Sequence, residues 1–559
     1  MPDPLPPDIA RSIAQGVALH RAGRLAEAER IYAQILQGRP DQFETLQLLA
    51  ELNMARGNLA DAQRAAAAAV AARPKSADAL VFLGHVQRAL RQDDEALKNF
   101  ERALAFEPNH IDALGMTGDA LLARGRATEA LACFDRILKA APQHAAARAN
   151  RAAALAGLGR FEEALADCDA AIAAAPGLVM ALYNRANALA NLGRDADALA
   201  AWDRLLAVAP QHFVAWSNRG NALSALKRHA EAVQSFARAI ALRPDYADAH
   251  FNQALALLAL GDYKRGLAEY EWRWKRSGMP VPRDFRRPLW LGEAPLAGKA
   301  ILLHAEQGLG DSIQFARYVP MLARAGAKIV LEVQAELKSL LERLDGAGSV
   351  IARGEALPAF DLHCPLGSLP LAFKTELSSV PAGIPYLQAN ESRVAQWRGR
   401  LAPAALPRVA LVWAGNPQHV NDRNRSIPLA ALKPLIDAGG FGFVSLQRDL
   451  RAADAEILKA MPAMLPLGDA PADLDDTAAI LALCDLVISV DTAVAHLAAA
   501  MGRPTWVLLP FAPDWRWTVE GERSPWYPAA RLYRQARAGD WDGVIARARA
   551  ELAGFSPSN

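Results

Sequence analysis

A period of 34 residues organises the first half of the chain and limits its fold more than any other feature. An alanine recurs every 34 residues from Ala28 to Ala232. In most repeats a large side chain such as Tyr32 stands four residues after this alanine. Prolines recur at the same spacing at Pro40, Pro74, Pro108, Pro142, Pro176, Pro210 and Pro244. A fixed period of this length is typical of a solenoid, in which each unit buries its apolar face only against its neighbours.

This pattern resembles the tetratricopeptide repeat. Each unit of that repeat has two antiparallel helices, with small residues where the helices cross and a proline after the second helix. Small residues such as Gly16 and Gly84 keep the same step here, and eight units fit between about residue 9 and about residue 280. The resemblance implies an α-solenoid, a single curved superhelix. A repeat defines an architecture and not a reaction.

Asparagines at equivalent positions of successive units suggest a ligand for the solenoid. They are Asn150, Asn184, Asn218 and Asn252, with Asn187 and Asn221 three residues further on. An amide has donors and an acceptor, which suits an extended peptide backbone in the inner groove. A similar ladder occurs in the solenoid of protein O-GlcNAc transferases, and that resemblance favours binding of a protein or peptide. The alternative is a solvated polar face. Such arrays sometimes form homodimers, and the sequence leaves the oligomeric state open.

Bulk properties exclude several classes of partner. The formal net charge of +2 gives no reason to expect nucleic acid or an anionic membrane as a partner. The N-terminus lacks the order of a signal peptide, and apolar runs are too short to span a bilayer, so a cytoplasmic location is expected. The four cysteines are Cys133, Cys168, Cys364 and Cys484. Their spacing is not that of metal ligands, and they are expected to be reduced thiols in the core.

Beyond Lys299 short apolar strands alternate with helical stretches. The candidate strands span residues 300–304, 328–333, 360–363, 408–413, 441–446, 486–490 and 505–509. This alternation predicts an α/β fold with parallel sheets covered on both faces, in two Rossmann-like lobes. The predicted domains are a solenoid over 9–280, a linker over 281–296, a first lobe over 297–390 and a second lobe over 391–559.

Three further segments have structural interpretations. Residues 271–276 alternate Trp with basic residues, which favours docking of the last repeat on the next domain over stacking on a nucleotide. Residues 473–476 are predicted to be the acidic first turn of a helix and not a metal motif. Residues 511–517 are predicted to pack at the junction of the lobes, with contact to a base or sugar as the alternative.

The segment after Val490 most suggests a binding site. Asp491 and Thr492 end a buried β-branched run and begin an alanine-rich helical pattern, with Asp or Thr as the helix cap. The first N–H groups of a helix have no internal partner and suit phosphate. Thr492 offers a hydroxyl, and His496 lies one turn along on the same side. This turn is predicted to hold the diphosphate of a nucleotide-linked donor. The alternative is an ordinary capped helix.

Loops after other predicted strands contain further candidate ligand-binding residues. In the first lobe, Gly308 and Gly310 allow close approach of the backbone to a ligand, and Asp311 begins a helix that it could also simply cap. In the second lobe, candidates for donor binding are Asn416, Arg425 and Gln447. An arginine beside a helix start can hold phosphate oxygens in bidentate fashion, although exposed surface arginines are commoner. Ligands of such folds bind beyond the carboxyl ends of strands, here between the lobes.

Taken in order, these motifs resemble the glycosyltransferase family that contains the bacterial lipopolysaccharide heptosyltransferases, over residues 297–540. The resemblance implies two lobes of the type called GT-B, a nucleotide-sugar donor, inversion at the anomeric carbon, and no metal or other cofactor. Matched positions are Asp311 for the general base, Gly308 and Gly310 beside it, Arg425 where a phosphate-binding lysine is usual, and Asp491, Thr492 and His496 for the nucleotide-phosphate loop. Ala493 replaces a usual glycine, and ordinary heptosyltransferases have no solenoid.

Two hypotheses follow. The first is a transferase whose solenoid selects a protein, peptide or glycan acceptor, with Asp311 accepting the acceptor's proton while Arg425 and Thr492 stabilise the departing diphosphate. The second is a non-catalytic interaction scaffold with a degenerate transferase domain. The joint presence of Asp311, Arg425 and His496 favours the first. The sequence specifies neither the sugar, the nucleotide nor the acceptor.

Overall fold

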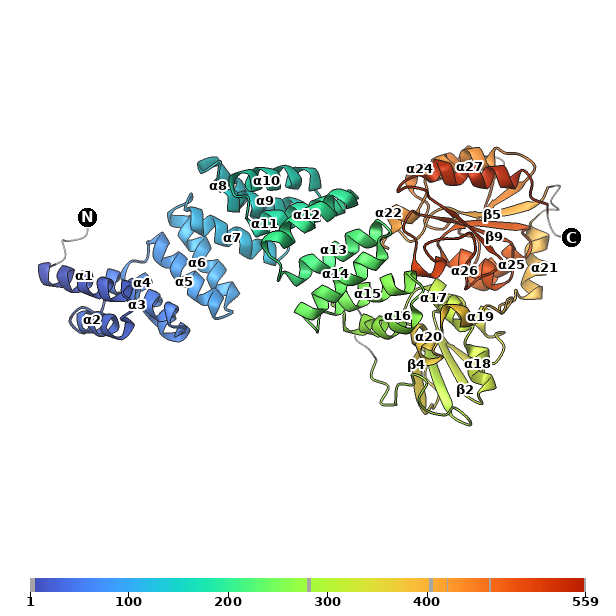
Figure 1. Ribbon diagram of the computed structural model, residues 1–559, viewed down its shortest axis with the longest axis horizontal. Helices are drawn as coiled ribbons and strands as arrows, with labels where there is room; N and C mark the ends of the chain where they lie inside the picture. The colour runs from blue at the N-terminus through green and yellow to red at the C-terminus, as the bar shows by residue number, and fades with distance from the viewer. Residues whose placement is uncertain (1–5, 279–282, 402–405, 420, 462–463, 557–559) are drawn as a thin grey trace. The chain divides into compact units, whose positions relative to one another are not determined.

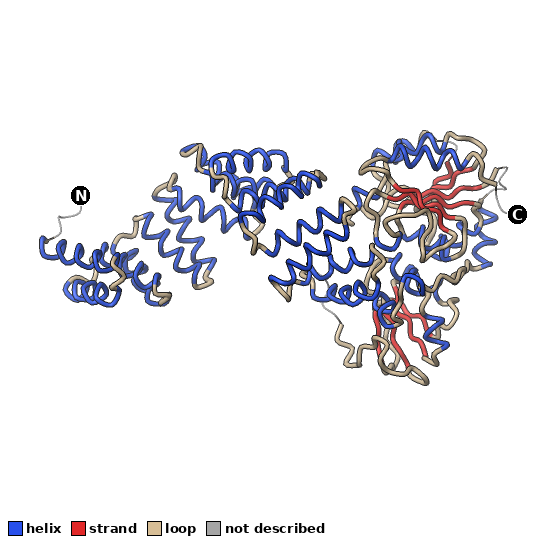
Figure 2. The backbone as a smooth tube through the Cα atoms, in the orientation of Figure 1, coloured by secondary structure: helices blue, strands red, loops and turns tan. Residues whose placement is uncertain are grey.

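The structure is a computed structural model that describes residues 6–278, 283–401, 406–419, 421–461 and 464–556 (Figure 1). The chain divides into two compact units, Met1–Gln211 and His212–Asn559. Among its described residues the first unit contains helices alone, whereas the second contains helices and strands (Figure 2). The α-solenoid followed by an α/β region is therefore confirmed. A single superhelix across both units stays a prediction.

In the described part of the first unit, twelve helices form six pairs, and each pair matches one 34-residue period. They are α1 (Pro7–Arg21), α2 (Leu25–Gly38), α3 (Phe43–Ala55), α4 (Leu59–Ala72), α5 (Ala77–Ala89), α6 (Asp93–Phe106), α7 (Ile111–Ala123), α8 (Ala127–Ala140), α9 (Ala145–Gly157), α10 (Phe161–Ala174), α11 (Val179–Asn191) and α12 (Asp195–Val208). Each of these helices can bury its apolar stripe only against its partner helix and the neighbouring helix pair.

The two helices of a pair approach closely where the first carries a small residue. A Cβ added at Gly16 would lie 2.5 Å from Cε1 of Tyr32, and one added at Gly118 would lie 2.5 Å from Cζ of Phe134. Neither side chain could move away cheaply, because both aromatic rings are fully buried. The predicted small residues at the helix crossings are therefore confirmed.

The second unit begins with the last two repeats. Their helices are α13 (Phe213–Ala225), α14 (His229–Leu242), α15 (Ala247–Ala259) and α16 (Tyr263–Tyr270), followed by the 3-10 helix η1 (Glu271–Lys275). The predicted linker, residues 281–296, also falls in this unit. Residues 281 and 282 of it lie outside the described residues.

The first sheet has the strand order β3-β2-β1-β4. Its strands are β1 (Ala300–His304), β2 (Lys328–Val333), β3 (Ser349–Ala352) and β4 (Leu362–Pro365), and all pairs are parallel. Its helical segments are α17 (Leu309–Ala316), α18 (Val319–Arg324), α19 (Ala335–Leu341), η2 (Leu366–Ser368), α20 (Leu369–Ala372) and η3 (Leu377–Ser379). Ile301 of β1 is opposite Ile329 on one side and Leu362 on the other, so β1 is central.

The second sheet has the order β10-β9-β8-β5-β6-β7, again with parallel pairs. Its strands are β5 (Arg408–Val412), β6 (Gly442–Ser445), β7 (Met464–Pro466), β8 (Leu486–Val490), β9 (Thr505–Leu509) and β10 (Ala530–Arg534). Its helical segments are α21 (Glu391–Arg400), α22 (Asp422–Arg425), α23 (Leu429–Ile436), α24 (Ala452–Lys459), α25 (Leu474–Ala482), α26 (Ala493–Ala500), η4 (Trp515–Trp517) and α27 (Trp541–Leu552). The carboxyl ends of the strands share one edge because all strands are parallel.

The last repeat packs directly on the two lobes. The Tyr263 hydroxyl accepts a hydrogen bond from Nε1 of Trp526 at 3.0 Å, and the Tyr270 hydroxyl accepts one from Nε2 of Gln307 at 2.7 Å. Arg273, in the predicted docking segment, is only 3% exposed. Docking of residues 271–276 on the following domain is therefore confirmed.

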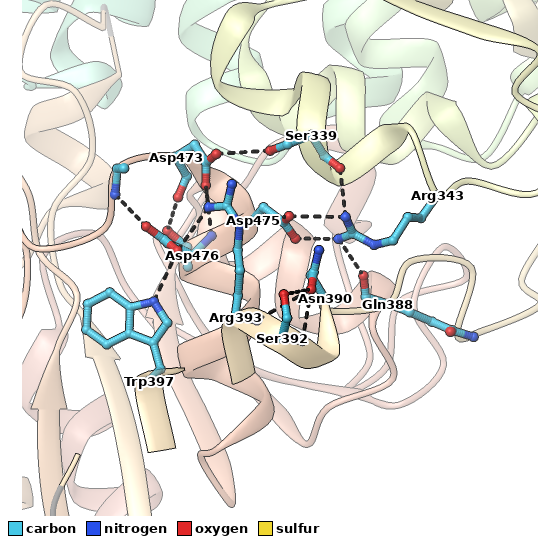
Figure 3. Close-up of polar contacts among 12 residues, drawn as sticks. Ser339, Arg343, Gln388, Asn390, Ser392, Arg393, Trp397, Asp473, Asp475 and Asp476 are labelled. Carbon is cyan, nitrogen blue, oxygen red and sulfur yellow. Dashed lines mark hydrogen bonds and ion pairs between the residues drawn. The ribbon is translucent and has the colours of Figure 1, made fainter. Parts of the chain in front are cut away.

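A polar network joins the first lobe to α25 of the second (Figure 3). The Arg343 guanidinium, from the segment after α19, donates to both carboxylate oxygens of Asp475, which is 1% exposed. Arg393 of α21 pairs with Asp473 at 2.7 Å and with Asp476 at 2.9 Å. Asp473 is the N-cap of α25, so residues 473–476 form the acidic first turn that the sequence predicts. These ion pairs fix one side of the lobe junction.

Candidate active site

Two helices that follow central strands meet where the lobes face each other. The loop after β1 leads into α17, and Thr492, directly after β8, is the N-cap of α26. A Cβ added at Gly310 would lie 2.9 Å from Cδ2 of His496 and 3.7 Å from Cα of Ala493. The first turn of α17 therefore lies against the first turn of α26, and glycine permits this approach.

Asp311 lies at this junction and is held from both lobes. Its Oδ2 accepts a hydrogen bond from the Gly308 N–H at 3.0 Å, and its Oδ1 forms an ion pair with Arg516 from η4 of the second lobe. Arg516 also pairs with Asp514 at 2.8 Å. Burial alone would lower the pKa of the Arg516 guanidinium, but the carboxylates of Asp514 and Asp311 raise it above its usual value. The Arg516 guanidinium therefore keeps its positive charge beside Asp311.

His496 and Asp491 form a second buried pair. Nε2 of His496 lies 3.7 Å from Oδ1 of Asp491, and Nδ1 of His496 lies 3.0 Å from the Tyr527 hydroxyl. The imidazole also lies beside the Trp517 ring, with 5.0 Å between centroids. Burial raises the pKa of Asp491, but the hydrogen bond and charge of His496 oppose burial, and the pKa is lowered overall. Asp491 is thus ionised at neutral pH.

Arg425 connects two strand-end loops of the second lobe. Its Nη1 donates to the carbonyl oxygen of Asp491 at 3.1 Å, and its guanidinium lies directly over Gly415, where no side chain would fit. The buried Nε of Arg425 has no hydrogen-bond partner among the described residues. Oδ1 of Asp422 lies 3.8 Å from this Nε, so the two charges pair although no hydrogen bond forms between them.

The Thr492 hydroxyl does not cap α26, contrary to the cap predicted at this helix. It instead lies 2.9 Å from the Ser489 hydroxyl, which holds it against the end of β8. The N–H groups in the first turn of α26 therefore have no side-chain acceptor from the N-cap residue. The N-terminus of α26 therefore keeps the partial positive charge of its helix dipole, which favours an anion.

The side chains of two predicted donor-binding residues, Asn416 and Gln447, form hydrogen bonds with neighbouring backbone groups. Asn416 is exposed, and its Oδ1 accepts a hydrogen bond from the Gln418 N–H at 2.9 Å within its own loop. Gln447 is 5% exposed, and its amide accepts from the N–H groups of Trp413 and Ala414 and donates to the carbonyls of Ala414 and Arg448. Gln447 therefore ties the ends of β5 and β6 together, which leaves its amide little capacity for a ligand.

The solenoid asparagines bond to neighbouring repeats. In the first unit, Asn150 donates to Asp119 at 2.8 Å and Asn184 donates to the carbonyl of Ala149 at 2.9 Å. In the second unit, Asn252 donates to Oδ1 of Asn221 at 3.0 Å. The remaining two, Asn187 and Asn218, are half-buried. One bond leaves each amide further donors and acceptors, so binding of a peptide by these residues stays a prediction.

Sequence reasoning missed three residues of the site. Arg516 and Tyr527 contact Asp311 and His496, and the only signal for Arg516 was its place after β9 at the shared edge of the sheet. Residues 511–517 do pack at the lobe junction as predicted, since η4 is buried throughout. The third residue is Glu306, in the loop before Gly308, whose Oε1 accepts a hydrogen bond from the Gly367 N–H at 3.1 Å and pairs with Arg273 at 3.1 Å. Burial raises the pKa of Glu306 to about 7, against the opposing charge of Arg273.

Within the described ranges, no group of three or more His, Cys, Asp or Glu side chains could hold a metal ion. The same ranges contain no helix with the length and apolarity of a bilayer span.

Family models match both halves of the chain. Tetratricopeptide repeat models match residues 19–82, 77–110, 116–179, 180–212 and 220–261. The model of glycosyltransferase family 9 (heptosyltransferase) matches residues 451–510, a segment that contains Asp491, Thr492 and His496. A tetratricopeptide repeat array is therefore joined to an α/β region, of which residues 451–510 are similar to glycosyltransferase family 9.

Protein FlbA from Caulobacter vibrioides (strain ATCC 19089 / CIP 103742 / CB 15) is 29% identical to this chain over 327 residues. The similarity covers 54% of this chain and 54% of FlbA, so the chain spans about half the length of this curated relative.

Solved structures of repeat proteins are also similar. A tetratricopeptide repeat protein from Parabacteroides merdae ATCC 43184 is 19% identical, with 44% of this chain and 98% of that chain covered and a TM-score of 0.37. YrrB, described as a TPR protein with an unusual peptide-binding site, is 20% identical, with 34% and 96% covered and a TM-score of 0.29. MamA protein is 23% identical, with 30% and 91% covered and a TM-score of 0.28.

Proposed function

We propose that the chain transfers a sugar from a nucleotide-sugar donor to a protein, peptide or glycan acceptor, with inversion at the anomeric carbon and without a metal ion. One observation carries the proposal: groups from both lobes meet at the carboxyl edges of the sheets. Gly310 lies against His496, and Asp311 is paired with Arg516. Ligands of parallel α/β folds bind at this edge.

The donor's diphosphate is proposed to lie at the first turn of α26. The N–H groups of this turn are free of a side-chain cap, and Arg425 reaches the same loop through the Asp491 carbonyl. The guanidinium of Arg425 supplies further donors for a phosphate oxygen. Because N–H dipoles and a guanidinium supply the positive charge, the proposal requires no divalent cation.

In the proposed reaction, an acceptor oxygen or nitrogen forms a bond to the anomeric carbon as the bond from that carbon to the diphosphate breaks. Asp311 accepts the proton that the attacking atom loses, and the diphosphate leaves with the electron pair of the broken bond. Attack opposite the leaving group inverts the configuration. Arg425 and the first turn of α26 stabilise the charge that builds on the diphosphate, a contribution of typically several kcal/mol.

The acceptor is proposed to be chosen by the solenoid. Tetratricopeptide arrays bind proteins and peptides, and the asparagines retain free amide capacity after their bonds to neighbouring repeats. The last repeat also contacts the residue before Gly308 through the bond between Tyr270 and Gln307. An acceptor bound on the last repeat, in the second unit, would thus be close to the loop that carries Asp311.

A transfer assay tests the proposal. The full chain is incubated with a panel of nucleotide-sugars and the proteins that co-purify with it, and mass spectrometry measures added hexose or heptose. Asp311→Asn should abolish transfer yet keep the rise in melting temperature that nucleoside diphosphates cause. The matched control is Asp437→Asn, because Asp437 is exposed and pairs only with Lys433 on the surface of α23. Normal transfer by Asp311→Asn would show that Asp311 is not the base.

One observation favours the scaffold alternative. Both carboxylate oxygens of Asp311 already have partners, Gly308 and Arg516, so the carboxylate could serve only to join the lobes. The two functions differ in nucleotide binding. A transferase should be stabilised by about 2.7 kcal/mol at a ligand concentration one hundred times Kd, whereas a scaffold should show no shift with any nucleoside diphosphate.

A further inference from the structure

One turn position of the repeats adopts a left-handed backbone in every unit. It joins the two helices of each pair, and φ there ranges from 59° to 81°. Its occupants are Gly23, Gly57, Arg91, Gly125, Gly159, Gly193, Lys227 and Gly261. Glycine tolerates this conformation, whereas a residue with a Cβ loses about 1 kcal/mol there. Lys227 and Arg91 therefore occupy a position where the fold itself favours glycine.

Lys227 differs from Arg91 in its surroundings. Arg91 is exposed, but Lys227 is half-buried with its Nζ 4.2 Å above the centre of the Phe511 ring. Burial lowers the pKa of Lys227, and the charge of Arg534 lowers it further, although Glu520 opposes both. No carboxylate among the described residues is in ion-pair contact with this ammonium. The face of the Phe511 ring and the more distant charge of Glu520 stabilise this ammonium.

Phe511 places Lys227 beside the loop after β9, one strand away from the loop that begins α26. Phe511 lies in the loop after β9. Because β9 pairs in parallel with β8, the loops after these two strands lie next to each other at one edge of the sheet. The loop after β8 begins α26 at Thr492. The seventh repeat therefore brings a cation to the edge where Arg425 and the helix N-terminus already concentrate positive charge.

A second basic side chain lies in the same turn. His229, two residues after Lys227, is 7% exposed, and neither ring nitrogen has a hydrogen-bond partner among the described residues. Burial lowers the pKa of His229, and the charge of Lys227 lowers it further, so the ring is neutral at pH 7 and has one N–H to donate. Buried polar groups without partners mark places where ordered water or a ligand completes the bonding.

We infer that Lys227 binds the phosphate-bearing part of a nucleoside diphosphate, so that the seventh repeat supplies a residue of the donor site. The inference rests on the proposed function, because that function brings the nucleotide to this edge. Lysine is a compact point charge that binds phosphate readily. Strained residues cluster at functional sites, and Lys227, unlike the exposed Arg91, combines this strain with a contact to the loop after β9.

Isothermal titration calorimetry with UDP, GDP, ADP and CDP on the full chain tests the inference. Lys227→Gly should raise the Kd of the nucleotide that the wild type binds by roughly tenfold, the change expected when one charged contact is lost. The same variant should melt at a higher temperature, because glycine relieves the backbone strain. Arg91→Gly is the matched control: it should also melt higher but should bind the nucleotide with the wild-type Kd.

A further variant separates charge from backbone. Lys227→Gln keeps the strain and removes the charge, so it should weaken the nucleotide without raising the melting temperature. An unchanged Kd in both Lys227 variants would overturn the inference and leave the proposed function in place. If the wild type bound none of the four nucleotides, the proposed function would fail, and the assignment of Lys227 would fail with it.

Discussion

Replacing Gly310 by alanine would force α17 away from α26. The new methyl carbon would lie 2.9 Å from Cδ2 of His496, closer than a Cβ approaches another heavy atom in folded proteins. His496 has no space to retreat, because it is 5% exposed, contacts the Tyr527 hydroxyl at 3.0 Å and lies beside Trp517. The two helices must separate, and the ion pair of Asp311 with Arg516 must stretch with them.

Overpacking of this kind costs about 1–3 kcal/mol, so Gly310→Ala should lower the free energy of unfolding by about 2 kcal/mol. Urea denaturation followed by tryptophan fluorescence measures it, since Trp202 is the one tryptophan of twelve outside the second unit. The control is Gly399→Ala in α21, where an added Cβ meets nothing within 4 Å and alanine favours the helix. A Gly310→Ala variant as stable as the wild type would refute the contact between the helices.

Three further predictions concern stability and reactivity. Asp475→Asn should lower the free energy of unfolding by about 3 kcal/mol in the same urea assay, because it breaks a buried ion pair with Arg343 and Arg393; an unchanged midpoint would contradict the network in Figure 3. Burial raises the pKa of Glu306 to about 7, so the folded state binds the carboxyl proton more tightly than the unfolded state does. The stability that this proton contributes is therefore complete below about pH 4.5 and is lost as the pH rises to about 7. Glu306→Gln should therefore lose less stability than the wild type over this window, and parallel pH curves would contradict the assignment. The four cysteines are free and buried, and burial raises the pKa of each, so a thiol reagent should label them only after unfolding; rapid labelling of the native chain would refute their burial.

Regular patterns made most of the fold predictable. The 34-residue period defines the helix pairs, and the seven predicted strands are present, with bounds that shift by at most two residues at each end. The sequence did not reveal β3, β7 and β10, which are outer strands of their sheets. β3 and β7 have only four and three residues, and β10 carries Arg531 and Arg534 among its apolar residues, which breaks the apolar run that marks a buried strand.

The loops of the site were predictable because they follow buried strands, but the partners in them were not. Asp311 and Arg516 are 205 residues apart, and no local pattern connects them. Gln447 lies at a strand end as predicted, yet only the structure reveals that four hydrogen bonds occupy its amide. Lys227 departs from a glycine position of the repeat, and its contact with Phe511 depends on how the repeats pack on the second lobe.

The central claim is that the ends of β1, β5 and β8 form one site for a nucleoside diphosphate without a metal ion. Calorimetric titration of the full chain with UDP, GDP, ADP and CDP in excess EDTA tests it most directly. One of the four should bind with a stoichiometry near one, and Arg425→Ala should weaken that nucleotide roughly tenfold, since it removes the guanidinium beside the Asp491 carbonyl. Binding that requires magnesium, binding that is equal in wild type and Arg425→Ala, or no binding of any nucleotide would contradict the claim.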